Sequence, residues 1–159
     1  MLEILITLAK LVRPFEGLAK KLANGSIGPY ICPAGYWTRG YGIRVKDGNA
    51  PAITTAEAEV ELFDKLPYYV NEAIRICPRL VKYVAGPGYC PLRVAAIADF
   101  VFNLGPGAFA ASTLKKRLDR EDWEAACREL PKWVYGGGRV LPGLVLRRAA
   151  EIKLIRTTL

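Results

Sequence analysis

The chain has 159 residues, of which 52% are hydrophobic and 24% are charged, and its formal net charge is +8. This length and composition suit one globular domain and exclude an intrinsically disordered chain, while the charge predicts an anionic partner such as a bacterial cell wall or a nucleic acid. Histidine is absent, which excludes catalytic triads built on histidine and zinc sites with histidine ligands.

The first 12 residues form an apolar run that only Glu3 and Lys10 interrupt. Leu5, Leu8 and Val12 recur at helical spacing, which predicts an amphipathic first helix. The run is too short to span a bilayer, and it lacks both a basic start and a small-residue cleavage site. We therefore expect no export signal and accumulation in the cytoplasm, with an uncleaved membrane-tethering signal as the alternative.

Glu16 lies just after this run, next to Phe15 and followed by Gly17 and Leu18. A carboxyl group held against apolar neighbours is poorly solvated, so it can keep its proton near neutral pH and act as a general acid. A solvated surface charge near a helix end is the alternative interpretation. Pro14 predicts that the helix bends or restarts there, with Pro14 in the first turn of the part that carries Glu16.

Residues 30–42 combine aromatic residues and glycines in the pattern of a tight β-hairpin. A turn-rich segment, residues 18–29, separates this hairpin from Glu16. A free thiol is mostly uncharged at neutral pH, so Cys32 by itself predicts a small buried hydrophobic residue. Thr38 by itself predicts a β-branched strand residue.

Helical patterns dominate the rest of the chain. In chain order, the sequence predicts a helix that starts at the capping box 54–57, kinks at Pro67 and ends at Pro78, an apolar core helix over 92–104, a short helix over 119–130 and a loop over 133–139.

The four cysteines form no CxxC pair and show no metal-ligand spacing. We expect reduced, partly buried thiols, with a Cys77–Cys90 bridge formed after export as the alternative. Cys127 lies on an apolar helix face and is expected in the core. We expect neither a metal nor another cofactor.

Three blocks of the sequence resemble the phage lysozyme family of glycoside hydrolases, also called endolysins or muramidases. The blocks are Phe15-Glu-Gly-Leu18 with the hairpin motif 33–42, residues 98–105 with 108–114, and residues 143–151. The third block places Arg147 and Arg148 near Glu151, and we expect these arginines to pair with Glu151 or with the hairpin region, Glu16 included.

The resemblance covers nearly the whole chain and implies an α+β, lysozyme-like fold in a single catalytic domain, residues 1–159. It implies a small β-hairpin lobe at about 17–52 and a larger helical lobe at about 53–159. The N-terminal helix belongs to the helical lobe, and a cleft separates the two lobes. The longer segment 18–29 departs from the family pattern and affects the shape of that cleft.

The resemblance also implies the roles of individual residues. Glu16 corresponds to the catalytic glutamate, and Thr38 is expected to orient the attacking water. Cys32 stands six positions before Thr38, where the best-known members have aspartate and others have cysteine. The implied substrate-binding residues are Tyr41, Gly42, Phe102 and Thr113. Structural packing is the alternative for Tyr41 and Phe102, and helix capping is the alternative for Ser112 or Thr113.

The implied activity is hydrolysis of the β-1,4 bond between N-acetylmuramic acid and N-acetylglucosamine in peptidoglycan, which lyses the bacterial host. The implied partner is the glycan strand, and we expect a monomer without bound nucleic acid and without stable membrane insertion. The protein would wait in the host cytoplasm and act on the wall, in the periplasm, after release. A lytic transglycosylase and a non-catalytic module that binds cell wall or nucleic acid are the alternatives.

Overall fold

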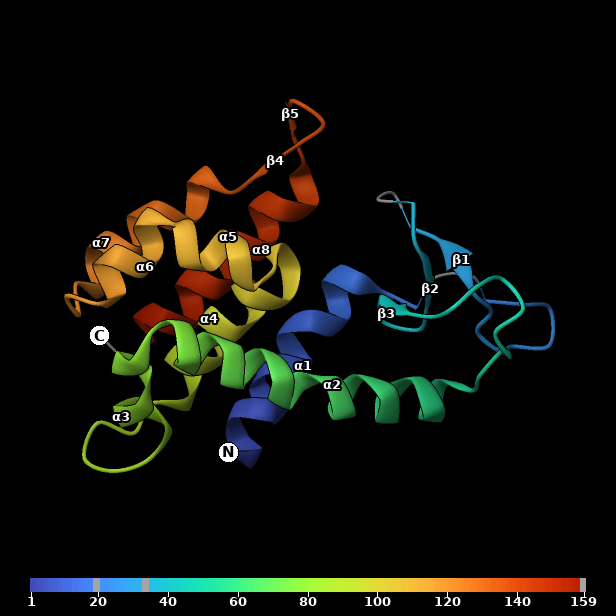
Figure 1. Ribbon diagram of the computed structural model, residues 1–159, viewed down its shortest axis with the longest axis horizontal. Helices are drawn as coiled ribbons and strands as arrows, with labels where there is room; N and C mark the ends of the chain where they lie inside the picture. The colour runs from blue at the N-terminus through green and yellow to red at the C-terminus, as the bar shows by residue number, and fades with distance from the viewer. Residues whose placement is uncertain (19–20, 33–34, 158–159) are drawn as a thin grey trace. The chain divides into compact units, whose positions relative to one another are not determined.

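A computed structural model describes residues 1–18, 21–32 and 35–157 of the chain (Figure 1). Its elements are α1 (Leu2–Glu16), β1 (Tyr30–Ile31), β2 (Trp37–Arg39), β3 (Ile43–Arg44), α2 (Thr55–Ile76), α3 (Val81–Val84), α4 (Pro91–Leu104), α5 (Pro106–Ala111), α6 (Thr113–Leu118), α7 (Trp123–Glu129), β4 (Tyr135–Gly136), β5 (Arg139–Val140) and α8 (Pro142–Arg156). The α+β architecture expected from the sequence is confirmed. Within the described ranges, no helix is both long and apolar enough to cross a membrane.

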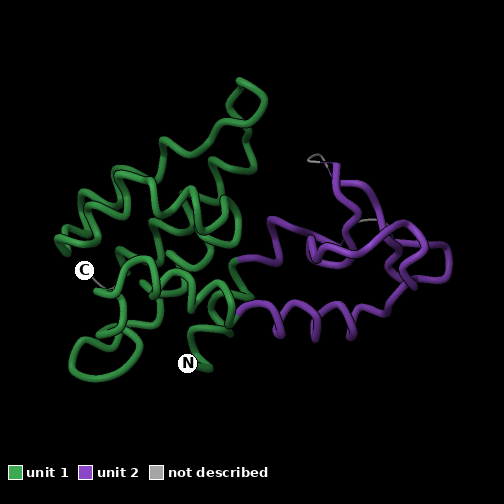
Figure 2. The backbone as a smooth tube through the Cα atoms, viewed as in Figure 1, with its two compact units in different colours: residues 1–11, 67–159 green, residues 12–66 purple. Residues whose placement is uncertain are grey.

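The backbone divides into two compact units (Figure 2). The hairpin unit comprises residues 12–66, and the helical unit comprises residues 1–11 together with residues 67–159. The chain passes between the units within α1 and again within α2, at Pro67. The lobe expected at about 17–52 lies inside the hairpin unit, which also takes in the end of α1 and the first part of α2.

Helix α1 runs without interruption from Leu2 to Glu16 and contains Pro14 in its last turn. The helix therefore does not restart at Pro14, and that part of the prediction is wrong, whereas a bend at Pro14 stays a prediction. A proline in the last turn removes only one backbone hydrogen bond, and Leu8 and Val12 are fully buried, so burial of the apolar face outweighs that loss.

The hairpin unit contains a three-stranded antiparallel sheet in the order β1–β2–β3. Thr38 in the central strand pairs with Tyr30 on one side and with Arg44 on the other. The hairpin expected over residues 30–42 is thus present and extends into β3. Pro33 and Ala34 of the expected motif lie outside the described residues.

The turn-rich segment before the hairpin closes on itself. Asn24 accepts a hydrogen bond from the backbone N–H of Ser26 at 3.0 Å, an Asx turn of the kind that asparagine favours. Ile27 is fully buried and exchanges backbone hydrogen bonds of 2.7 and 3.0 Å with Ile53. This segment is therefore anchored to the chain just before α2.

Helix α2 starts at the predicted capping box. The Thr54 hydroxyl accepts the Glu57 N–H at 3.1 Å, and the Glu57 carboxylate accepts the Thr54 N–H at 2.7 Å. These reciprocal bonds satisfy two of the backbone donors that a helix start leaves open. The helix continues through Pro67 and ends at Ile76, close to the predicted end at Pro78.

The helical unit is built around α4, which is buried on nearly all sides as predicted. Arg147 on α8 donates to both oxygens of Asp99 on α4, at 2.8 and 2.9 Å. Arg148 donates to Glu151 at 2.6 Å, so the expected pairing of an arginine with Glu151 is confirmed. Burial and the nearby Asp99 raise the pKa of Glu151, and the Arg148 guanidinium opposes that rise.

Two local predictions for the helical unit are wrong. The helix expected over 119–130 starts at Trp123, because Glu121 has a φ of 58° and Asp122 caps the helix by accepting the N–H of Ala125 at 2.9 Å. The loop expected over 133–139 is the two-stranded hairpin β4–β5. Its turn residues Gly137 and Gly138 both have positive φ, as a type I′ hairpin turn requires.

The buried pair between Arg148 and Glu151 generates a stability prediction. Arg148→Met removes the guanidinium and leaves the Glu151 carboxyl buried without it, so we expect the free energy of unfolding to fall by about 3–5 kcal/mol. Urea denaturation measures this loss. The double variant Arg148→Met/Glu151→Leu removes both charges and should recover most of it. A single variant as stable as the wild type would contradict the assigned pairing.

Candidate active site

Glu16 is the last residue of α1 and is half-buried. The helix ends there, and the N–H of Gly17 bonds to the Arg13 carbonyl at 3.0 Å. The Glu16 carboxylate lies over the backbone of Gly42: a methyl group built on Gly42 would be 3.2 Å from Glu16 Oε2. Gly42 also has a φ of +75°, which residues other than glycine rarely adopt. Two independent constraints therefore favour glycine beside the candidate acid.

Cys32 and Thr38 lie on the same face of the hairpin. Thr38 pairs with Tyr30, and the Cys32 N–H continues the ladder by bonding to the Tyr36 carbonyl at 2.9 Å. Paired residues of an antiparallel ladder point to the same side, and alternate residues of a strand do so as well. Cys32 and Thr38 are thus diagonal neighbours on adjacent strands. The Cα atoms of two such residues are typically about 7–8 Å apart.

Thr38 and Cys32 differ in burial and in hydrogen bonding. Thr38 is only 3% exposed, and its hydroxyl donates to the Tyr30 carbonyl at 3.4 Å. This distance is long for a hydroxyl donor, so the bond is weak and the hydroxyl remains able to hold another partner. Cys32 is half-buried at the end of β1.

All four cysteines lie in the described ranges, and all are free, as expected. Cys77, Cys90 and Cys127 are buried. Burial, together with the Asp119 carboxylate 3.6 Å from its sulfur, raises the pKa of Cys77 to about 11. Burial likewise raises the pKa of Cys127. Cys32 is therefore the most accessible thiol of the four.

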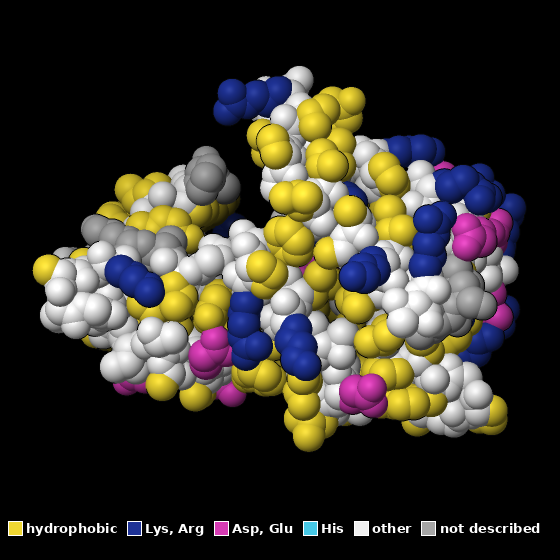
Figure 3. All heavy atoms as spheres, turned by 180° about the vertical axis from the view of Figure 1, so that it is seen from behind, with side chains coloured by type: hydrophobic (Ala, Val, Ile, Leu, Met, Phe, Trp, Pro, Cys, Tyr) yellow, Lys and Arg dark blue, Asp and Glu magenta, His cyan; other side chains and the backbone are white. Residues whose placement is uncertain are grey.

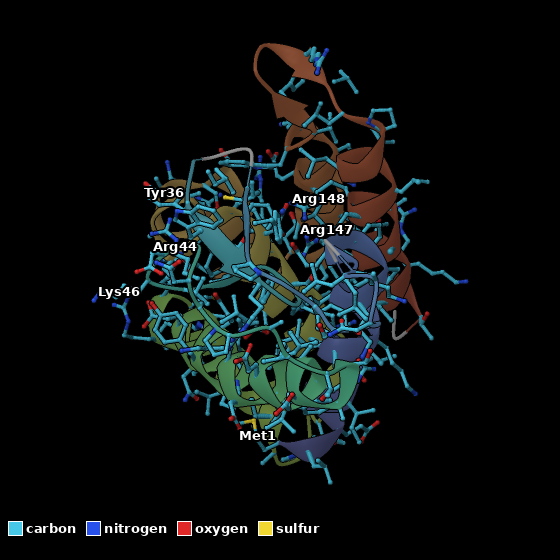
Figure 4. All side chains as sticks on the ribbon, turned by 90° about the vertical axis from the view of Figure 1, so that its right-hand side faces the viewer. Met1, Tyr36, Arg44, Lys46, Arg147 and Arg148 are labelled. Atoms are coloured by element: carbon cyan, nitrogen blue, oxygen red, sulfur yellow. The ribbon has the colours of Figure 1, made fainter. Side chains whose placement is uncertain are left out.

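An arginine and a tyrosine extend the face that carries Thr38. The Arg44 guanidinium lies 3.6 Å from the centre of the Tyr36 ring, and Figure 4 shows these two side chains next to each other. Arg44 pairs with Thr38 across β2 and β3, so it projects on the same side. Tyr36 is 48% exposed. An exposed ring with a polar edge is suited to packing on a sugar.

Tyr41 and Gly42 belong to the turn between β2 and β3, but they face different partners. Tyr41 is only 6% exposed, and its hydroxyl donates to Glu59 on α2 at 2.6 Å. Arg13 donates to the same carboxylate. The buried environment of Tyr41 matches the packing alternative, and little of its ring is open to a saccharide. Gly42 meets the Glu16 carboxylate, as described above.

Arg13 and Glu59 are not among the site residues predicted from the sequence. They are 46 positions apart, and neither lies in a recognisable motif. The only feature of the sequence that could have indicated a role for Arg13 in the site is its position one helical turn before Glu16.

The two other predicted substrate-binding residues belong to the helical unit. Phe102 is half-buried, and its ring centre lies 4.7 Å from that of Tyr69. Thr113 is exposed at the first position of α6, where Ser112 rather than Thr113 caps the helix by accepting the Lys115 N–H at 3.0 Å. The hairpin unit thus contains five of the seven predicted residues, and Phe102 and Thr113 lie outside it.

Basic side chains surround Thr113. It lines a shallow hollow of about 190 Å³ with Lys116, Arg117 and Arg120. Figure 3 shows Lys and Arg side chains gathered over the part of the helical unit that carries α6 and α7, with acidic side chains between them. This surface contributes to the positive charge that predicts an anionic partner.

Comparison with known proteins identifies similar sequences and folds. Residues 15–151 match the family described as phage lysozyme. The chain is 33% identical over 151 residues to the endolysin of Acyrthosiphon pisum secondary endosymbiont phage 1, covering 92% of this chain and 93% of that protein. It is 41% identical over 123 residues to the SAR-endolysin of bacteriophage PS119, covering 77% and 70%. The muramidase domain of SpmX from Asticaccaulis excentricus superimposes with a TM-score of 0.73, at 25% identity and 93% coverage of each chain.

The contact at Gly42 generates a prediction with a matched control. Gly42→Ala should lose about 1–2 kcal/mol of unfolding free energy, because an L-residue is strained at positive φ, and its methyl group should displace the Glu16 carboxylate. Gly25 has a φ of +81°, and a methyl group built on it would have no atom within 4 Å, so Gly25→Ala should show the strain alone. We expect Gly42→Ala, and not Gly25→Ala, to abolish most clearing of cell-wall suspensions. Equal activity of the two variants would contradict the contact.

Proposed function

The chain belongs to the phage lysozyme family, and we propose that it is an endolysin that hydrolyses the β-1,4 bond between N-acetylmuramic acid and N-acetylglucosamine in bacterial peptidoglycan. The family makes it a lytic enzyme of the cell wall. The observation that carries the finer proposal is the half-buried Glu16, whose carboxylate lies beside Gly42 in the unit that also presents Cys32 and Thr38 on one hairpin face.

Glu16 is proposed as the general acid. It gives its proton to the glycosidic oxygen as the bond from that oxygen to the anomeric carbon breaks, so that the leaving sugar departs with a neutral hydroxyl group. A half-buried carboxyl suits this task, because part of it is held by the protein and part can reach a glycan.

Thr38 and Cys32 are proposed to handle the attacking water. The weak bond from Thr38 to the Tyr30 carbonyl, 3.4 Å long, leaves the Thr38 hydroxyl able to hold a water molecule. The oxygen of this water bonds to the anomeric carbon, and its proton passes to Cys32, acting as the base, or to solvent. Direct attack of water inverts the anomeric centre. Attack by Cys32 itself would instead form a glycosyl-thiol intermediate, and a water molecule would then bond to the anomeric carbon and release the Cys32 sulfur, so that two displacements retain the configuration.

A lytic transglycosylase is the second candidate, and the thiol at position 32 is the observation that favours it. Such an enzyme uses Glu16 together with a hydroxyl group of the substrate as the nucleophile, so it needs no second carboxylate. Hydrolysis yields reducing ends, whereas transglycosylation yields anhydro ends. Under either mechanism the proposed partner is a glycan strand, met after the protein has reached the wall, and the proposed acting form is a monomer.

The role of Glu16 is tested by Glu16→Gln, which keeps the shape of the side chain and removes its proton. We expect turbidity clearing to fall by about 100-fold or more, because a general acid typically contributes 10²–10⁴-fold. Folding and binding to purified peptidoglycan should be preserved, and Glu124→Gln, at an exposed position, serves as the control. Full clearing by Glu16→Gln would refute the role of Glu16 as the general acid, and a wild type that binds peptidoglycan without clearing it would favour a binding module.

Mass spectrometry of peptidoglycan digested with the wild type separates the two enzymatic candidates. Reducing ends support the hydrolase, and anhydro ends support the transglycosylase.

The role of Cys32 is tested by two substitutions. Cys32→Asp places a carboxylate where the thiol stands and should retain activity. Cys32→Ala should reduce the rate by about 100-fold, because loss of a general base typically costs 10²–10⁴-fold in rate. Cys77→Ala removes a buried thiol from the other unit and should leave the rate per folded molecule unchanged. Full activity of Cys32→Ala would remove Cys32 from the mechanism.

A further inference from the structure

Two side chains in the hairpin unit donate hydrogen bonds to one carboxylate, that of Glu59. Arg13 Nε donates to Glu59 Oε1 at 3.1 Å and to Oε2 at 3.0 Å, and Arg13 Nη2 donates to Oε2 at 2.5 Å. The Tyr41 hydroxyl donates to Oε1 at 2.6 Å. Both carboxylate oxygens are therefore bonded, and charge-assisted bonds of this kind are among the strongest in proteins.

The charge of this network is stable around neutral pH. Burial alone would raise the pKa of Glu59, but the hydrogen bonds from Arg13 and Tyr41 outweigh it and lower that pKa. The bond to Glu59 raises the pKa of Arg13, and burial together with the same bond raises the pKa of Tyr41. Glu59 thus stays ionised while both of its donors keep their protons.

The network joins the two segments that meet at the candidate acid. Arg13 precedes Glu16 by three positions on α1, so the two residues lie on the same side of the helix. Tyr41 directly precedes Gly42, which lies so close to the Glu16 carboxylate that a methyl group built on it would be 3.2 Å from Oε2. Glu59 on α2 holds Arg13 and Tyr41 together from a third element.

The same turn also runs close to α2 at Gly40. A methyl group built on Gly40 would lie 3.3 Å from Ala58 Cβ, one residue before Glu59. Gly40 and Gly42 bring no side chains of their own, so Tyr41 is the only side chain with which this three-residue turn is anchored. Loss of the Tyr41 hydroxyl would therefore leave the turn next to Glu16 less tightly defined.

We propose that Arg13, Glu59 and Tyr41 are positioning residues that hold the Gly42 backbone against Glu16 and thereby orient the general acid. This inference rests on the proposed role of Glu16. It assigns Tyr41 the role of supporting the general acid and not that of binding the saccharide. The effect on rate can be large, because a displacement of about 1 Å in a catalytic group can cost about 100-fold.

The chain supplies a matched control for this network. Arg39 on β2 forms an ion pair with Glu61 on α2, so this pair also ties the sheet to the helix within the hairpin unit. Glu61 lies two residues from Glu59, but its partner belongs to β2 and not to the turn or to α1. Breaking this pair removes a similar interaction without touching the segments that meet at Glu16.

The first experiment compares Tyr41→Phe and Glu59→Gln with Glu61→Gln in steady-state cleavage of soluble glycan strands. We expect kcat to fall by about 10-fold or more in Tyr41→Phe and Glu59→Gln, a loss of rate that misplacement of a catalytic group can cause. KM should stay within about 2-fold of the wild-type value, because these residues do not bind the saccharide. Glu61→Gln should change kcat by less than about 2-fold at a similar loss of stability. A rise in KM alone in Tyr41→Phe would instead mean saccharide contact, and equal losses of kcat in all three variants would mean general destabilisation. Either result would overturn the proposal.

Two substitutions of Arg13 test the geometry of the network. Arg13→Lys keeps the charge but loses the fork that reaches both oxygens of Glu59. It should therefore recover part of the kcat that Arg13→Ala loses. Equal kcat values in the wild type and in Arg13→Ala would contradict a positioning role for Arg13.

A double-mutant cycle then tests whether the network acts through Glu16. In the Glu16→Gln background, Tyr41→Phe should cause no further loss of the residual rate, because the group that it positions is already gone. A full additional loss would overturn the inference while leaving the role of Glu16 intact. Full activity of Glu16→Gln itself would instead overturn the proposed function, so the two failures are distinguishable.

Discussion

The close approach of the Glu16 carboxylate to Gly42 is the constraint on which the candidate site depends. A side chain at position 42 would come within 3.2 Å of Oε2, and the positive φ at this position independently favours glycine. The contact brings the end of a helix to the turn of a hairpin. The acid is therefore placed by two backbone features, a helix terminus and a left-handed glycine, which meet only in the folded chain.

The small three-stranded sheet needs additional interactions with the rest of the unit to keep the turn at Gly42 in place. Its strands have two or three residues each, and sheets of this size have little stability of their own. Two carboxylates on α2 supply additional bonds: Glu59 holds the turn through Tyr41, and Glu61 holds β2 through Arg39. The first turns of α2 thus serve the hairpin unit as a support, which explains why the boundary between the units falls at Pro67 rather than before the helix.

Predictions from local sequence succeeded where the determining residues are neighbours. The capping box at Thr54 and Glu57, the apolar helix α4 and the strand pairing around Thr38 all depend on residues close in sequence. Errors arose where tertiary packing outweighed a local signal. Burial of the apolar face carried α1 through Pro14. The β4–β5 hairpin is a different case, because the positive φ of Gly137 and Gly138 is a local hairpin signal that the loop prediction missed.

The sequence by itself determined the family resemblance, the candidate acid and the two hairpin residues that accompany it. These rest on motifs whose residues lie close together in the sequence, so their spacing can be recognised along the chain. Only the tertiary structure decided what surrounds them. Glu59 accepts hydrogen bonds from Arg13 and Tyr41, which are 46 and 18 positions away. Such partners are chosen by the path of the folded backbone, because a carboxylate binds whichever donors the fold brings within about 3 Å.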